Sequence, residues 1–109
     1  MLRAIDGIAK LRAQAERVRV DGNRAYNPGW HTALDLHHLL TVSEAIARSA
    51  VERRESRGAQ FRDDYPKLDP ALSKMNVVVR KGPDGAMRLE RRPIPDIPGE
   101  LKQIIEELK

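Results

Sequence analysis

Charged side chains of both signs are concentrated between residues 52 and 64, and such groups could serve as catalytic acids and as a carboxylate-binding fork. The charged residues of this stretch are Glu52, Arg53, Arg54, Glu55, Arg57, Arg62, Asp63 and Asp64. An arginine can donate two parallel hydrogen bonds to one carboxylate, so the arginines could hold a substrate while the acids exchange protons with it. The same residues could instead pair with one another and join the end of a helix to the following loop. We expect this structural network, because ion pairs commonly gather at the ends of elements, and we assign no catalytic residue.

Three residues further upstream, His31, Asp35 and His38, have side chains of the kinds that bind metal ions. They would lie near one face of a helix, at offsets of four and seven residues. His31 and His38 would then be about 10 Å apart along the axis, too far to share one ion, so we predict no metal site. His37 and His38 point in different directions and are interpreted as interface or hydrogen-bonded residues. Trp30 is expected to pack into the core rather than to act as a stacking platform.

One long helix must position most of these residues. Asn27 can cap it with its side-chain oxygen, and Pro28 suits the first helical position. No proline or glycine follows between Trp30 and Arg57, and Gly58 can take the left-handed conformation that closes a helix. The sequence therefore predicts a helix that runs to Arg57. Its apolar residues cover most of its circumference, which is typical of a helix surrounded by protein.

A second helix is predicted before it. Apolar residues recur every three or four positions from Leu2 to Val20, which is the period of an amphipathic helix. The short connection over residues 21–27 contains Asp21-Gly22-Asn23, a turn signal, and implies that the two helices are antiparallel.

A β-hairpin and a short helix are predicted after the long helix. Residues 75–80 are rich in β-branched side chains and residues 86–92 alternate apolar and charged, with Pro-Asp-Gly between them. Prolines keep residues 93–98 extended, and residues 99–109 have the pattern of a final helix. We therefore predict a mainly α fold. An antiparallel helical bundle occupies residues 1–70, and the hairpin and terminal helix occupy residues 71–109.

Composition limits the classes of function. The 109 residues fit one domain, and 20 Lys and Arg against 16 Asp and Glu give a net charge of only +4. The absence of cysteine excludes disulfides, thiolate metal sites and iron–sulfur ligation within this chain. No run of 18 apolar residues and no leader pattern occurs, so we expect a cytoplasmic chain without direct membrane insertion.

Nucleic-acid binding remains an alternative. The basic residues that would contact phosphates are Arg3, Lys10, Arg12, Arg17, Arg19 and Arg24. Acidic residues interrupt this set and no aromatic residues are interleaved with it, so we expect no nucleic-acid partner. A helical protein–protein interaction module is the other alternative.

The run from residue 53 to residue 66 resembles the C-terminal domain of succinate dehydrogenase and fumarate reductase flavoprotein subunits, in which it reads approximately R-x-E-S-R-G-A-H-x-R-x-D-x-P. The matching residues are Arg53, Glu55, Ser56, Arg57, Gly58, Ala59, Arg62, Asp64 and Pro66. Apart from Ala59 we treat them as a structural signature. Asn27-Pro28-Gly29-Trp30-His31 also looks like this family, whereas Gln60 stands where the family usually has histidine.

The resemblance implies an oxidoreductase that interconverts succinate and fumarate with FAD in the intact subunit. In such subunits the FAD-binding and capping domains hold the cofactor and the substrate, and this chain has no G-x-G-x-x-G turn. We therefore assign no cofactor-binding residue and expect the isolated chain to be inactive. The implied partners are those two domains and an iron–sulfur subunit, at the inner face of a membrane. An isolated domain would expose apolar surface and could form a homo-oligomer.

Overall fold

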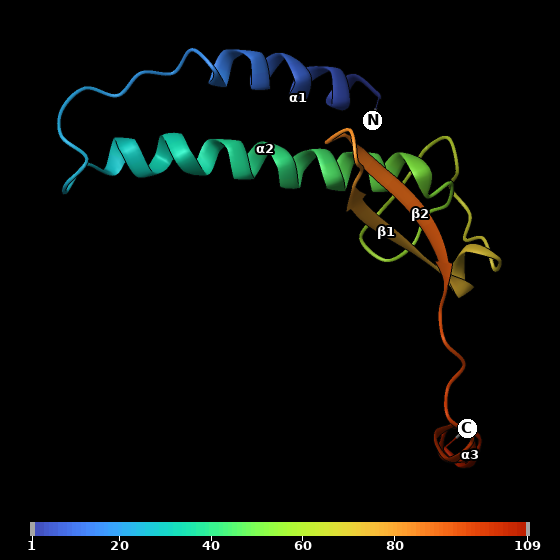
Figure 1. Cartoon of the computed structure of the whole chain (residues 1–109). Helices are drawn as coiled ribbons and strands as arrows, with labels where there is room; N and C mark the ends of the chain where they lie inside the picture. The colour runs from blue at the N-terminus through green and yellow to red at the C-terminus, as the bar shows by residue number, and fades with distance from the viewer. Residues whose placement is uncertain (1, 109) are drawn as a thin grey trace.

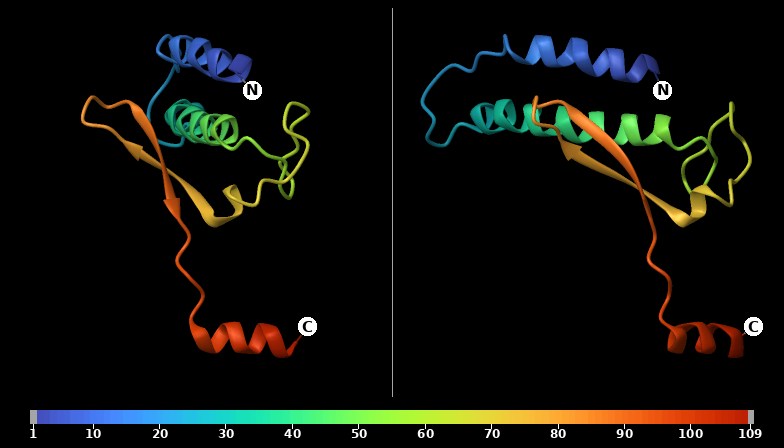
Figure 2. Two further views of the ribbon diagram at one scale, coloured as in Figure 1. Left: turned by 90° about the vertical axis from the view of Figure 1, so that its right-hand side faces the viewer. Right: turned by 45° about the vertical axis from the view of Figure 1, so that its right-hand side comes forward.

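The computed structural model describes residues 2–108, which fold into helices followed by a hairpin and a final helix (Figure 1). The elements are α1 (Leu2–Ala15), α2 (Pro28–Glu52), the 3-10 helix η1 (Leu72–Lys74), β1 (Met75–Lys81), β2 (Met87–Pro93) and α3 (Gly99–Glu107). The two longer helices lie side by side and antiparallel, and the hairpin lies against the second half of α2 on the side away from α1 (Figures 1 and 2). The predicted mainly α fold is confirmed.

The first helix is shorter than predicted. It ends at Ala15 rather than at Val20, and its last turn tightens, because the N–H of Val18 donates to the carbonyl oxygen of Ala15. The two valines that follow are β-branched, which lowers helix propensity and favours extended backbone. The residues after Ala15 instead form the connection that leads to the start of α2 (Figure 1).

The start of α2 is confirmed and its end differs from the prediction. The side-chain oxygen of Asn27 accepts a hydrogen bond from the N–H of Trp30 at 3.3 Å, and Pro28 occupies the first turn. The helix ends at Glu52, five residues before Arg57, and Arg53 is already extended with ψ 98°. This early end is what lets the chain turn back and bury a charged residue, as described below.

Gly58 does not close the helix. Its φ of 57° serves a two-residue turn, in which the backbones of Arg57 and Gln60 donate hydrogen bonds to each other at 2.9 and 3.0 Å. Glycine easily adopts a positive φ, and Gly58 does take the left-handed conformation that its residue type predicted. It does so in the loop after α2 rather than at the end of the helix.

The hairpin forms as predicted. β1 and β2 pair antiparallel with Met75 opposite Pro93 and Lys81 opposite Met87. Gly85 has φ 78°, and the N–H of Gly82 donates to the carbonyl oxygen of Ala86 at 2.7 Å to close the turn. Beyond β2 an extended segment leads to α3, which stands away from the other elements (Figure 2).

The hydrophobic core is very small. Among residues 2–108 the buried apolar side chains are Ala15, Leu40 and Leu72. The radius of gyration is 19.8 Å, whereas a compact domain of this length would have about 13 Å. Trp30 is only half-buried, with the guanidinium of Arg24 4.8 Å from its ring centroid, so its predicted place in the core is wrong. In the part of the chain that the structure describes, none of the helices has the length and apolar character needed to cross a bilayer.

Candidate functional site

Glu55 is the centre of the predicted charge cluster and has no exposed surface. Its Oε1 accepts hydrogen bonds from Arg53 Nη1 and Arg57 Nε, both at 2.8 Å. Its Oε2 accepts from Arg57 Nη2 at 3.0 Å and from the backbone N–H of Asp69 at 2.8 Å. These donors hold the pKa of Glu55 below its ordinary value, chiefly through the hydrogen bonds from Arg57, while burial acts in the opposite direction. Glu55 is therefore a charged and fully hydrogen-bonded residue.

The two arginines that bind Glu55 also fasten it to the chain that follows. Arg53 donates through Nη2 to the carbonyl oxygens of Leu72 and Met75, at 3.1 and 2.7 Å. Arg57 donates to the carbonyl oxygen of Asp69 at 3.3 Å. The cluster thus connects the end of α2 to the 3-10 helix and to the first residue of β1.

Arg62 caps the carboxyl end of α2. Only 8% of it is exposed, and its Nη1 donates to the carbonyl oxygens of Ala50, Val51 and Arg53 at 2.9, 3.0 and 3.0 Å. The last carbonyls of a helix have no partner within it and carry partial negative charge, so a cation at this place is stabilising. The other edge of the guanidinium pairs with Asp64, with Nε 2.9 Å from Oδ1. That pairing is the main reason that the pKa of Asp64 lies below its ordinary value.

Two uncharged residues, Ser56 of the signature and the neighbouring Gln60, complete the loop. Ser56 Oγ accepts from the backbone N–H of Arg62 and donates to the carbonyl oxygen of Tyr65, both at 2.9 Å. Gln60 Nε2 donates to the carbonyl oxygen of Arg53 at 3.3 Å, so the residue that departs from the family pattern contributes a further hydrogen bond at the helix end.

The remaining charged residues of this stretch lie outside the buried part. Glu52 pairs with Arg91 on β2, with Oε1 2.8 Å from Nε. Arg54 and Asp63 are exposed. Pro66 also lies on the exposed side of the loop.

The geometry favours a structural role for the cluster. The carboxylate of Glu55 is enclosed by donors, and Arg53, Arg57 and Arg62 direct theirs to protein oxygens. A substrate carboxylate would have to displace these internal bonds, and the charge left behind would then be buried without a partner. We call Arg53, Glu55, Arg57 and Arg62 the helix-end brace. That none of them is catalytic stays a prediction.

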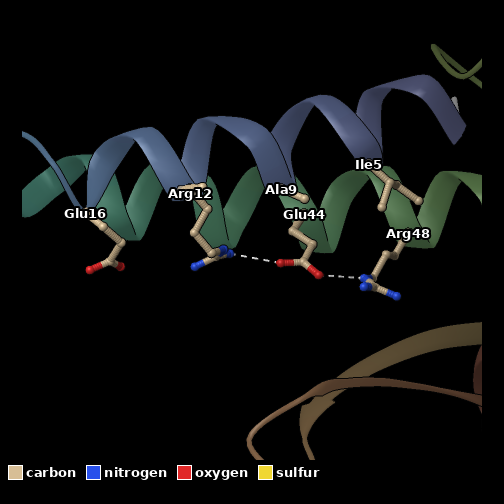
Figure 3. A pocket seen from close by; sticks show the side chains of 7 residues that line it. Ile5, Ala9, Arg12, Glu16, Glu44 and Arg48 are labelled. Carbon is tan, nitrogen blue, oxygen red and sulfur yellow. Dashed lines mark hydrogen bonds and ion pairs between the residues drawn. The ribbon is translucent and has the colours of Figure 1, made fainter.

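A second ion-pair network joins α1 to α2 and was not predicted from the sequence (Figure 3). Glu44 accepts from Arg12 Nη2 at 2.9 Å and from Arg48 Nε at 2.7 Å. Hydrogen bonding from Arg48 is the largest cause of its lowered pKa. The spacing of four residues between Glu44 and Arg48 is a recognisable helix signal, but the contact with Arg12 depends on how the helices pack.

Three of the basic residues considered for nucleic-acid binding make contacts within the chain. Arg12 is paired with Glu44, and Arg24 lies over the ring of Trp30. Arg19 donates to the backbone oxygens of Glu16 and Val18. His31 makes an edge contact with Trp30, and within residues 2–108 no three His, Cys, Asp or Glu side chains gather as a metal site.

Comparison with known proteins identifies relatives of nearly the whole chain. The family model described as "Fumarate reductase flavoprotein C-term" matches residues 1–103. The fumarate reductase flavoprotein subunit of Haemophilus influenzae is 36% identical over 95 residues, which are 86% of this chain and 16% of that protein. The L-aspartate oxidase of Streptomyces coelicolor is 29% identical over 98 residues, 90% of this chain and 17% of that protein.

Solved structures have the same fold. The Sdh1 complex of Mycobacterium smegmatis in the apo form contains a chain that superimposes with a TM-score of 0.79 at 35% identity, covering 89% of this chain and 17% of that one. A variant of the quinol fumarate reductase of Escherichia coli gives a TM-score of 0.73 at 31% identity, covering 86% and 17%. The chain therefore spans about one sixth of the length of these relatives.

Proposed function

The chain belongs to the family of fumarate reductase flavoprotein C-terminal domains, and we propose that it completes a flavoprotein subunit that interconverts succinate and fumarate. The family match over residues 1–103, with the same fold in the solved relatives, is the observation that carries this proposal. FAD and the dicarboxylate would be bound by the remainder of such a subunit. The inferred partners are its FAD-binding and capping domains and an iron–sulfur subunit, through which it would lie at the inner face of a membrane.

The described residues do not fit FAD. A dinucleotide site needs a strand followed by a glycine-rich turn and a helix whose N–H groups face the pyrophosphate. Here the glycine-containing turn after β1 leads into β2, and α2 begins at Pro28 without a preceding strand. No redox step is therefore assigned to this chain, and we expect it to stay colourless when it is purified alone in excess FAD.

The exposed apolar surface supports a role as part of a larger protein. Leu39, Val42 and Ile46 recur at intervals of three and four residues along α2, and each is more than half exposed. A line of apolar side chains of this kind marks a surface that another protein segment covers. The small core agrees with this, since the domain buries little of its own apolar area.

The helix-end brace would contribute to the intact subunit by holding the end of α2 and the chain after it in one conformation. Arg62 binds carbonyl oxygens in the last turn of α2, Gln60 binds the carbonyl oxygen of the residue after it, and Glu55 fixes the chain that follows. The domain can then present its exposed apolar surface in one conformation, which lowers the conformational entropy lost when that surface is covered.

A chimera tests the proposal. In the flavoprotein subunit of Haemophilus influenzae, the segment that matches this chain is replaced by the chain itself. We expect the purified chimera to retain FAD and to reduce fumarate, whereas the same subunit without that segment should lose both properties. A well-folded chimera without FAD, beside a native subunit that contains it, would refute the proposed function.

A further inference from the structure

A hollow of about 730 Å³ lies where the start of α1, the end of α2 and the signature loop meet. Its walls include Leu2, Arg3, Val51, Arg54, Phe61 and Tyr65. We propose that this hollow is a docking site for the remainder of the flavoprotein subunit and that Phe61 is its anchor. The inference rests on the proposed function and extends it by naming the surface and the chemistry of the contact.

The loop that carries Phe61 is held by buried polar groups. Arg62, the next residue, is nearly buried and bonded to two carbonyl oxygens of α2 and to that of Arg53, and its guanidinium also lies 4.8 Å from the ring centroid of Tyr65. Ser56 Oγ bonds the backbone of Arg62 and of Tyr65, on either side of residues 63 and 64. Phe61 itself is nevertheless 68% exposed. The structure thus fixes the backbone on both sides of an aromatic side chain that contributes little to its own core.

Such an arrangement is expected of a binding anchor. Aromatic and arginine side chains dominate the energetics of protein interfaces, and a rigid loop loses little conformational entropy when it binds. A side chain whose role was to stabilise this domain would instead be buried against it.

The charges around the hollow indicate the chemistry of the partner surface. Arg3 and Arg54 are exposed on its rim, while the carboxylate of Asp64 is already paired with Arg62. Asp63 is also exposed there and offsets part of the positive charge. The partner surface should therefore offer an apolar pocket for Phe61 with carboxylates beside it for Arg3 and Arg54.

The remainder of the subunit fits this description better than a second copy does. About five sixths of the relatives' length lies outside the part that this chain matches, so ample surface is available there. A two-fold symmetric contact between copies through this hollow would bring together two surfaces that each carry Arg3 and Arg54 against the single offsetting charge of Asp63, so like charges would predominate, which is electrostatically unfavourable.

The experiment compares Phe61→Ala in the chimera and in this chain alone. We expect the melting temperature of the chimera to fall by roughly 3–6 °C, whereas that of the chain alone should change by no more than about 1 °C. Tyr26→Ala is the matched control, because Tyr26 is a fully exposed aromatic residue at the opposite end of α2. It should leave both melting temperatures unchanged. Arg54→Glu should destabilise the chimera and not the chain.

Each outcome has a defined meaning. A chimera without FAD before any substitution refutes the proposed function and this inference with it. If the unsubstituted chimera retains FAD, and Phe61→Ala changes its melting temperature no more than Tyr26→Ala does, only the docking site is refuted. An equal loss of stability in the chain alone would show that Phe61 serves the domain itself, which also refutes the docking site.

Discussion

Glu55 keeps its charge in an enclosed position because each of its oxygens receives at least two hydrogen bonds. Removing a carboxylate from water is unfavourable unless donors replace the lost hydration, and three of these bonds come from arginines. The arrangement is sensitive to the loss of either partner. Without the carboxylate, two half-buried guanidinium groups would face each other, and without an arginine the carboxylate would be left under-bonded.

Replacing Glu55 by glutamine tests this pairing. Glu55→Gln keeps the shape of the side chain, removes its charge and leaves Arg53 and Arg57 uncompensated, so we expect the melting temperature to fall by roughly 5–15 °C. Glu90→Gln is the control, because Glu90 is an exposed partner of Arg92 and should change the melting temperature by less than about 2 °C. Thermal unfolding followed by circular dichroism measures both. Equal shifts would show that the buried pairing adds no more stability than the exposed pair.

The same carboxylate predicts how stability depends on pH. The pKa of Glu55 is lowered in the folded chain from an ordinary value of 4.5, so the stability that it provides is fully present above pH 4.5. It is lost as the pH falls through the folded pKa, because the unfolded chain then binds the proton more readily. Glu44 and Asp64 have lowered pKa values and act in the same direction. Denaturant titrations below pH 4.5 should show a smaller loss of stability in Glu55→Gln than in the unsubstituted chain, and parallel profiles would contradict the prediction.

At the scale of the element, the end of α2 is determined by residues outside the helix. The backbone N–H of Arg53 still bonds to Ser49, but Arg53 turns into extended backbone so that Glu55 can be enclosed. Arg62 then takes the place of the next helical turn by donating to three carbonyl oxygens. The geometry of a guanidinium suits this role because it offers several donors in one plane.

Substitution of Arg62 by lysine should therefore loosen the last turn of α2. Arg62→Lys keeps the positive charge. A single ammonium group, however, cannot bond both oxygens of Asp64 and three carbonyl oxygens at the same time. We expect amide hydrogen exchange over residues 50–56 to accelerate about tenfold or more, while exchange in the middle of α2 changes little. Arg17→Lys, at an exposed position after α1, is the control. Unchanged exchange near residue 53 in Arg62→Lys would show that the charge alone is sufficient.

The same elements show what the sequence could predict. The start of α2, the hairpin turn and the position of α3 follow from local rules of capping, turn residues and periodicity, and all are present in the structure. The end of α2 was misplaced because the absence of proline and glycine up to Arg57 carries no information about a distant partner such as Asp69. Arg12 and Glu44 are 32 residues apart in the sequence. Their contact depends on how α1 packs against α2, which a local sequence pattern does not reveal.

The candidate site was also predicted only in part from the sequence. The clustering of charges from Glu52 to Asp64 indicated a network, and the structure brings Glu55, Arg53 and Arg57 together. Which of the charges would be buried could not be predicted, because burial depends on where the chain turns back after α2. Trp30 was expected in the core on its residue type alone, but it lies near the exposed connection and is covered by Arg24 instead.

At the scale of the whole molecule, the shape is extended and the apolar surface is open. The chain measures 64 × 33 × 29 Å, and α3 presents Leu101, Ile104 and Ile105 to solvent, each about half exposed. A domain of this length that folded on its own core would be much more compact. The large exposed area is what the family membership explains, since the relatives are about six times longer.

An isolated chain with this surface should associate with itself. The apolar line formed by Leu39, Val42 and Ile46 has no covering segment within residues 2–108, so copies can bury it against one another. We expect the sedimentation coefficient to rise with concentration between about 1 and 100 μM, an interval typical of weak protein association. Val42→Lys combined with Ile46→Lys should suppress the rise, because burying lysine charges in an apolar contact is unfavourable. Thr41→Lys combined with Ser43→Lys adds the same charge at exposed polar positions of the same helix and should suppress it less. A single sedimentation coefficient across the whole concentration range would show that the isolated chain tolerates this surface in water.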